Sequence, residues 1–165
     1  MASLSQGRFD TCLETLRKIE TLLKRGGYNN TDALRILTLN NFGCCYRRCG
    51  KLHLALQYLT QAALLGSTTA THASNLSITH LNICAISSQL GKHEKALEHA
   101  HAAVFHCQEL MVSEANIFGE KTEQVELKNR GEKLVTLAIA YHNLAVELEF
   151  TGKLETCLQV NAYFK

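Results

Sequence analysis

The chain has 165 residues, a formal net charge of +2 and 19% charged residues. This length suits one domain with a sizeable core, and the nearly balanced charge, with no basic run longer than two residues, argues against a nucleic-acid-binding surface. No apolar run approaches the roughly 20 residues that span a bilayer, and the N-terminus lacks a secretory signal. Seven cysteines, an odd number without an export signal, indicate reduced thiols and a cytoplasmic protein.

The chain contains no proline, and the absence of the strongest helix breaker favours an all-helical fold. Helical periodicity predicts first a lone helix over residues 8–25, followed by a glycine break. A helical hairpin is then predicted over residues 31–65, and a loop over residues 66–69.

A second hairpin is predicted over residues 72–118, with a long second helix because residues 94–114 contain no helix breaker. A third hairpin occupies residues 120–165, and the chain stops inside its second helix. The polar stretch within residues 119–131 is compatible with a helix extension or with an insert. We therefore interpret residues 1–165 as a single domain from a longer protein, although the initial methionine also fits a natural start.

A glycine followed by a basic residue occurs four times, at spacings of 43, 41 and 61 residues: Gly7-Arg8, Gly50-Lys51, Gly91-Lys92 and Gly152-Lys153. A glycine at such a place can adopt the left-handed conformation that ends a helix. Small residues recur on both sides of the last three glycines, in the pairs Gly43 with Ala55, Cys84 with Ala96, and Ala145 with Cys157. Two helices cross at about 8–10 Å where small side chains meet. The pattern predicts a repeated helix–turn–helix unit that stacks into an array.

These positions resemble the tetratricopeptide repeat, whose motif combines bulky, small and aromatic positions, a turn glycine and three positions on the second helix. The first copy reads Leu39, Phe42, Gly43, Tyr46, Gly50, Ala55, Leu59 and Ala62. The second reads His80, Ile83, Cys84, Ser87, Gly91, Ala96, Ala100 and Ala103. The third reads Tyr141, Leu144, Ala145, Leu148, Gly152, Cys157, Asn161 and Phe164, and a preceding half copy reads Gly7, Cys12, Leu16 and Ile19.

The resemblance covers nearly the whole chain and implies an all-α, right-handed solenoid of about three and a half units. The period exceeds the family's usual repeat of about 34 residues, and the unit ends lack proline. In its repeat length the chain is more similar to kinesin light chains and spindle-orientation adaptors. The resemblance also implies a function in protein binding, because such solenoids expose a continuous concave groove.

One asparagine precedes each of the last three turn glycines by nine residues: Asn41, Asn82 and Asn143. In the family that the chain resembles, first helices line the groove, and asparagine at this position resembles a ladder that holds extended peptides. A carboxamide both donates and accepts hydrogen bonds, so it can bind a peptide backbone of any sequence. The alternative is a structural contact between hairpins or exposure to water; we favour the groove.

Arg48 follows Asn41 by two helical turns on the same stripe, and Arg47 borders that stripe. Either arginine can pair with an acidic residue of a ligand. The alternative is that both are simply solvent-exposed residues at a helix end. The family's basic clamp for C-terminal carboxylates is missing, since Asn40 and Cys44 occupy two of its positions. We therefore expect an extended internal peptide as the ligand.

Cys44, Cys45, Cys49 and His53 lie close together, and thiolates and imidazoles are zinc ligands. However, Gly50 interrupts the helix and paired Cys-x-x-Cys elements are missing. We interpret these cysteines as small apolar fillers and expect no metal or other cofactor.

His99 and His101 point to different faces of one helix, and His106 lies two turns from His99. Two turns separate side chains by roughly 10 Å, which is too far for one ion. We interpret these histidines as solvent or groove residues.

The sequence thus predicts a non-enzymatic scaffold or adaptor that binds an extended peptide segment of another protein, through Asn41, Asn82, Asn143, Arg47 and Arg48. We expect neither nucleic acid nor membrane as a partner. The alternatives are a structural module that self-associates through its ends, and a regulatory segment of a larger enzyme.

Overall fold

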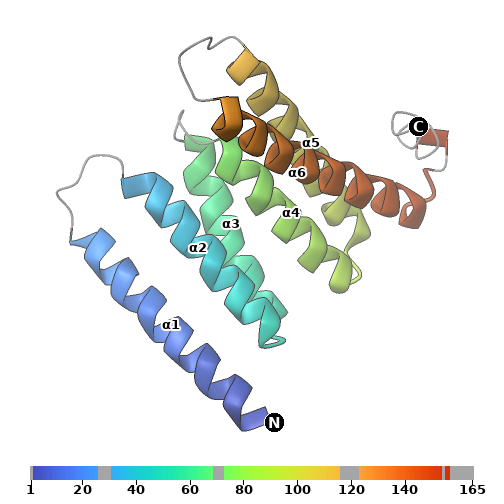
Figure 1. The fold of residues 1–165 in the computed structure, drawn as a ribbon. Coiled ribbons are helices and arrows are strands. Elements are labelled where there is room, and N and C mark those ends of the chain that lie inside the picture. The colour runs from blue at the N-terminus through green and yellow to red at the C-terminus, as the bar shows by residue number, and fades with distance from the viewer. Residues whose placement is uncertain (1, 26–30, 69–72, 116–122, 154, 157–165) are drawn as a thin grey trace. The chain divides into compact units, whose positions relative to one another are not determined.

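The computed structural model describes residues 2–25, 31–68, 73–115, 123–153 and 155–156. Across these residues the chain is all-helical, with six helices and no strand (Figure 1). The helices are α1 (Ala2–Lys24), α2 (Thr31–Arg48), α3 (Leu52–Thr68), α4 (Ala73–Gln89), α5 (His93–Ala115) and α6 (Glu123–Phe150). None of these helices is long and apolar enough to cross a membrane.

The chain divides into two compact units, Met1–Asn75 and Leu76–Lys165. In the first unit, α2 and α3 form an antiparallel hairpin, and α1 packs on α2 (Figure 1). Its core contains the fully buried side chains of Ile36, Phe42 and Leu59. Phe42 also stacks on Tyr58 with ring centroids 4.8 Å apart, which joins the two helices of the hairpin.

Small residues allow the close approach of α2 and α3. Ala55 is completely buried, as the sequence predicts. A Cβ atom placed on Gly43 would lie 2.6 Å from Cγ of Leu59, a distance that real Cβ atoms essentially never show. Leu59, one turn beyond Ala55, therefore occupies the space that glycine leaves open.

In the second unit, α5 packs against α6, and α4 contributes to the same core. This core is a cluster of Cys84, Ala96, Leu97, Ala100, Ala103, Val104, Cys107, Ala140, Leu144 and Leu148. Cys84 and Ala96, predicted as one crossing pair, are both buried there. Small residues on α5 again lie where helices meet.

The three predicted turn glycines all adopt the left-handed conformation, with φ of 72° at Gly50, 69° at Gly91 and 73° at Gly152. After α2, the Lys51 amide donates to the Tyr46 carbonyl at 2.9 Å and the Gly50 amide to the Arg47 carbonyl at 3.0 Å. These are the two bonds of a Schellman motif, which satisfies the last carbonyls of a helix.

The same pair of bonds follows α4 and α6. The backbone amides of Lys92 and Gly91 donate to the carbonyls of Ser87 and Ser88, both at 2.9 Å. Those of Lys153 and Gly152 donate to the carbonyls of Leu148 and Glu149, at 2.8 Å and 3.1 Å. The predicted helix ends at these three glycines are therefore confirmed, and the repeated glycine–basic pairs there correspond to identical backbone turns.

The first glycine–basic pair is different, and its prediction as a turn was wrong. Gly7 lies inside α1, which begins at Ala2 rather than at residue 8. A glycine within a helix costs only about 1 kcal/mol relative to alanine, and burial of Leu13 and Leu16 in the same helix offsets this cost. Glycine ends a helix only where the residues after it reverse the chain.

The other element boundaries agree with the sequence in most places. Helix α3 continues to Thr68, so the loop predicted from residue 66 was wrong; Gly66 is helical and buried. Helix α5 is long, as predicted. Helix α6 starts at Glu123, so the described part of the 119–131 stretch is a helix extension. Residues 157–165, which hold the rest of the third predicted repeat, lie outside the described residues.

Candidate functional site

The three predicted asparagines lie at one register on α2, α4 and α6, each nine residues before a left-handed glycine. Asn41 is exposed, whereas Asn82 and Asn143 are half-buried. Asn41 belongs to the first compact unit, and Asn82 and Asn143 belong to the second. In the part of the chain that the structure describes, none of the three carboxamides has a hydrogen-bond partner. Their donors and acceptors are therefore available to a ligand.

Asn40, the neighbour of Asn41, has a different environment. Its side chain is buried, and its Nδ2 donates to the Ile36 carbonyl of the preceding turn at 3.1 Å. An asparagine that serves the fold thus points inward and bonds to its own helix. Asn41 lies about 100° further round α2 and points outward, which distinguishes it from a purely structural asparagine.

Arg47 and Arg48 form the basic last turn of α2. Arg48 is exposed, while Arg47 is half-buried and already interacts within the chain. Cations at a helix C-terminus are stabilised by the helix dipole, so both arginines also serve the end of α2. Of the two, Arg48 is the more accessible to an acidic ligand.

The histidines of the second unit form a stack that the sequence did not reveal. His80 from α4 lies between His99 and His106 of α5, with ring centroids 5.1 Å and 5.5 Å apart. The Nδ1 atoms of His80 and His99 are 2.8 Å apart, so one ring donates to the other. His101 is exposed, as expected.

Two rings of the stack, His80 and His99, are harder to protonate than a free imidazole. Burial, together with the charges of His99 and His106, lowers the pKa of His80 to about 4. Burial also lowers the pKa of His99, and Lys95 lowers it further while Glu98 opposes the shift. Two neutral imidazoles can share a hydrogen bond at this distance, whereas two imidazolium ions would repel each other.

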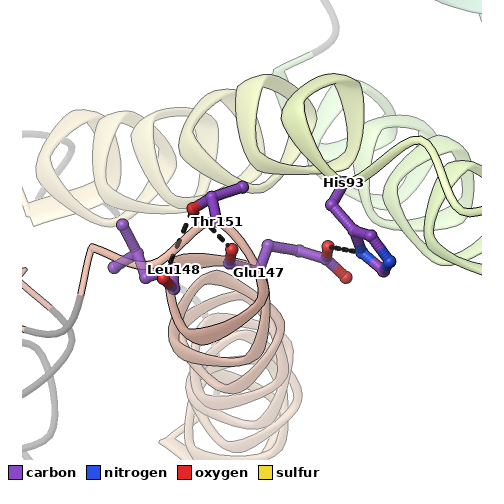
Figure 2. A network of polar contacts seen from close by, with 4 residues as sticks. All are labelled: His93, Glu147, Leu148 and Thr151. Atoms are coloured by element: carbon purple, nitrogen blue, oxygen red, sulfur yellow. Dashed lines mark hydrogen bonds and ion pairs between the residues drawn. The ribbon is translucent and has the colours of Figure 1, made fainter.

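A second polar contact joins α5 to α6 (Figure 2). Nδ1 of His93, the first residue of α5, lies 2.9 Å from Oε2 of Glu147, whose side chain is only 3% exposed. The His93 ring also stacks on Phe150 at 4.2 Å. Thr151 donates to the Glu147 carbonyl at 2.8 Å, which closes the last turn of α6.

Glu147 was not among the residues predicted from the sequence, although the sequence contains a signal for it. Glu147 lies between Leu144 and Leu148 on the buried stripe of α6, and a carboxylate on such a stripe needs a partner. No pattern in the sequence identifies that partner, because His93 lies 54 residues away. The charge of Glu147 adds to burial in raising the pKa of Cys84 to about 12, which keeps this thiol protonated.

Cys12 of α1 and Cys45 of α2 also come together, with their sulfur atoms 3.0 Å apart. The sequence places Cys45 among its neighbours on α2 and contains no signal that connects it with Cys12. Burial, then the hydrogen bond and charge of Cys12, raise the pKa of Cys45 to about 12. Within the described residues, no group of three or more histidine, cysteine or acidic side chains is arranged to hold a metal ion.

A pocket of about 380 Å³ opens in the first unit where the C-terminal ends of α1 and α3 meet the N-terminal half of α2. Leucines form much of its wall, and a Glu20–Lys24 ion pair of 2.9 Å lies on its α1 side. Arg35 lines the α2 side and pairs with Asp32 at 3.3 Å. A pocket of this size can hold one or two side chains of a ligand.

Comparison with known proteins does not assign the chain to a family. No protein-family model matches it, and no curated protein matches it.

Proposed function

We propose that this chain is a protein-binding scaffold that holds an extended peptide segment of a partner protein against its first helices. The proposal includes a right-handed solenoid similar to tetratricopeptide repeats, in which α2, α4 and α6 line the concave groove. The observation that carries it is the shared register of Asn41, Asn82 and Asn143, each at one distance from a left-handed glycine and none buried. The same carboxamide at the same helix position in three helices suits an extended peptide, whose N–H and C=O groups recur at regular intervals.

The chemistry of the asparagines defines the ligand. A carboxamide offers two donors and one acceptor oxygen, so it can bond to both the N–H and the C=O of an extended peptide. Each such bond contributes about 0.5–1.5 kcal/mol, and three together give useful affinity with little sequence preference. Arg48 adds a preference for an acidic residue at one end of the segment.

The scaffold needs no catalytic group, and we place it among the non-enzymatic adaptors of the cytoplasm. Two of the described cysteines, Cys84 and Cys107, are buried, and burial raises the pKa of both thiols, so neither is a ready nucleophile. Glu147 is engaged with His93 and sits in a packed helix junction. These environments favour binding over catalysis.

A peptide array provides the test. The wild-type chain is first screened against extended peptides, and the tightest binder is then measured by calorimetry with Asn→Ala variants. Each single change should weaken binding several-fold, and the triple change at Asn41, Asn82 and Asn143 by about a hundredfold. Circular dichroism should show unchanged helicity, because these carboxamides have no partners in the described chain.

In a matched control, alanine replaces three other exposed helical residues: Gln57, His101 and His142. This control triple should bind the peptide as tightly as the wild type. Equal losses in both triple variants, or full binding by the asparagine variant, would contradict the proposed groove.

Self-association is a second candidate, because the described part of α6 exposes large apolar side chains, among them Leu134, Val135 and Ile139. Exposed apolar patches are typical of protein–protein contacts. Light scattering over a range of protein concentrations separates the two candidates. A molar mass that stays at that of one chain while peptide binds supports the scaffold. A molar mass that rises with concentration, equally with and without peptide, supports self-association.

A further inference from the structure

The packing of α1 on α2 brings the thiols of Cys12 and Cys45 into contact. The two residues are 33 positions apart in sequence and come from different helices, yet their sulfur atoms are 3.0 Å apart. A disulfide bond is about 2.0 Å long, so the sulfurs need to approach by only about 1 Å. Helix packing in the first unit therefore already brings the two thiols together.

The exposure of the two thiols differs in a way that suits stepwise oxidation. Cys12 is exposed and Cys45 is half-buried. An exposed thiol is accessible to a small reagent, and a neighbouring thiol at contact distance can then resolve the product. Cys44 is also exposed, but the sulfur in contact with Cys12 belongs to Cys45.

We propose that Cys12 and Cys45 form a reversible disulfide by exchange with a low-molecular-weight disulfide, and that this bond fixes α1 to the first hairpin. Cys45 lies one helical turn beyond Asn41 on α2, and neither cysteine belongs to the asparagine register.

The reaction has two balanced steps. The Cys12 thiolate attacks one sulfur of the small disulfide; a Cys12–sulfur bond forms, the small S–S bond breaks, and the released thiolate takes up the proton that Cys12 lost. The Cys45 thiolate then attacks Sγ of Cys12 and releases the second small thiolate, which takes up the proton from Cys45. Two protein thiols are oxidised, and one small disulfide is reduced to two thiols.

The electrostatics of Cys45 supports this order. Burial is the main cause of its raised pKa, and the hydrogen bond and charge of Cys12 add to it. Once Cys12 carries the small thiol, that hydrogen bond and charge are gone, and Cys45 ionises more easily. Cys45 is thus a slow first nucleophile, and the loss of the two contributions of Cys12 makes the second step easier, although burial still raises its pKa.

The bond would have a structural consequence for α1. In the described part of α1, only Leu13 and Leu16 are buried apolar residues, so this helix has a thin contact with its neighbour. A crosslink at Cys12, next to these leucines, restrains α1 by a covalent bond and lowers the entropy of the unfolded chain. It also holds the α1 wall of the 380 Å³ pocket in place.

The test treats the reduced full chain with oxidised glutathione, blocks the remaining thiols and digests the protein with trypsin. Mass spectrometry should find residues 9–17 linked to residues 36–47, with the loss of two hydrogen atoms. The second peptide contains both Cys44 and Cys45, so variants identify the partner. Cys44→Ser should keep the linked pair at the wild-type rate, and Cys45→Ser and Cys12→Ser should lose it.

Thermal unfolding gives a second readout that does not depend on digestion. Oxidised wild type should melt about 5 °C above the reduced protein, and Cys12→Ser, a change at an exposed position, should show no such rise. A persistent glutathione adduct on Cys12 without a link to residues 36–47 would overturn the proposal. So would a link that forms in Cys45→Ser as fast as in the wild type.

Discussion

At the scale of single residues, Gly43 is the position where the fold tolerates no side chain. The space that a Cβ atom would need is filled by Cγ and Cδ2 of Leu59, at 2.6 Å and 2.8 Å. Cγ is the branch point of leucine and cannot swing aside without moving the whole side chain. The close packing of α2 and α3 therefore depends on the absence of a methyl group at this residue.

This gives a paired prediction with an internal control. Gly43→Ala should destabilise the chain by about 1–3 kcal/mol through overpacking. Gly131→Ala, also inside a helix but with nothing within 4 Å of the new Cβ, should stabilise it by about 0.5–1 kcal/mol through helix propensity. Urea unfolding measures both changes. If both variants changed the free energy of unfolding in the same direction, the close contact at Gly43 would be contradicted.

The histidine stack predicts how stability depends on pH. The folded state lowers the pKa of His80 from its ordinary value of 6.5 to about 4, so between these values the unfolded chain binds more protons than the folded chain. Stability is therefore present above about pH 6.5 and is lost as the pH falls toward 4. Because solvent screens this partly exposed ring, the loss from this group is about 1–3 kcal/mol, less than the full shift implies.

Urea unfolding of the wild type and of His80→Gln at several pH values measures this effect. The variant should lose less stability on acidification, whereas His101→Gln, at an exposed position, should behave as the wild type. Carboxylate titration affects all three proteins alike and cancels in the comparison. An equal loss in the wild type and in His80→Gln would show that the stack does not control the response.

At the scale of the helices, the turns and the helix junctions follow different rules. The turns after α2, α4 and α6 are local: a left-handed glycine and two backbone hydrogen bonds close each helix. The junction of α5 with α6 is long-range: it combines an apolar cluster with the His93–Glu147 contact, and Phe150 covers the imidazole ring. Local turns set where helices end, and long-range contacts set which helices pair.

The junction yields a prediction for Glu147. Glu147→Ala removes a buried acceptor and leaves His93 without this partner, so the chain should lose about 1–3 kcal/mol of stability. Glu149→Ala, two residues away and exposed, should change stability by less than about 0.5 kcal/mol. Thermal and urea unfolding provide the measurement.

A double-mutant cycle then isolates the contact itself. If His93 and Glu147 interact directly, the loss in the double variant His93→Ala, Glu147→Ala should be smaller than the sum of the two single losses. Strict additivity would mean that Glu147 acts through packing alone.

At the scale of the whole molecule, the chain comprises two compact units, and each contains one hairpin with a left-handed glycine at its turn. The first unit adds α1 to its hairpin, and the second adds α6. The proposed peptide ladder takes one asparagine from the first unit and two from the second. Because the register occurs in each unit, the variant that changes all three asparagines is the decisive test of the proposal.

Much of the fold could be predicted from the sequence because it rests on local rules. The lack of proline, the helical stripes and the spacing around Gly50, Gly91 and Gly152 predict an all-helical chain with turns at these three residues. The failures at Gly7 and Gly66 have one cause: a glycine in sequence carries no information on whether the next segment packs back. The asparagine register also comes from the sequence, and its role as a site stays a prediction.

The sequence by itself determined the composition of each helix, the identity of the turn glycines and the common register of the three asparagines, because these depend on neighbours within a few residues. Only the tertiary structure decided which distant side chains meet: Cys12 with Cys45, His80 with His99, and His93 with Glu147. These contacts depend on how helices pack, and packing is selected by the shape and burial of many side chains together. A one-dimensional pattern contains no measure of that shape.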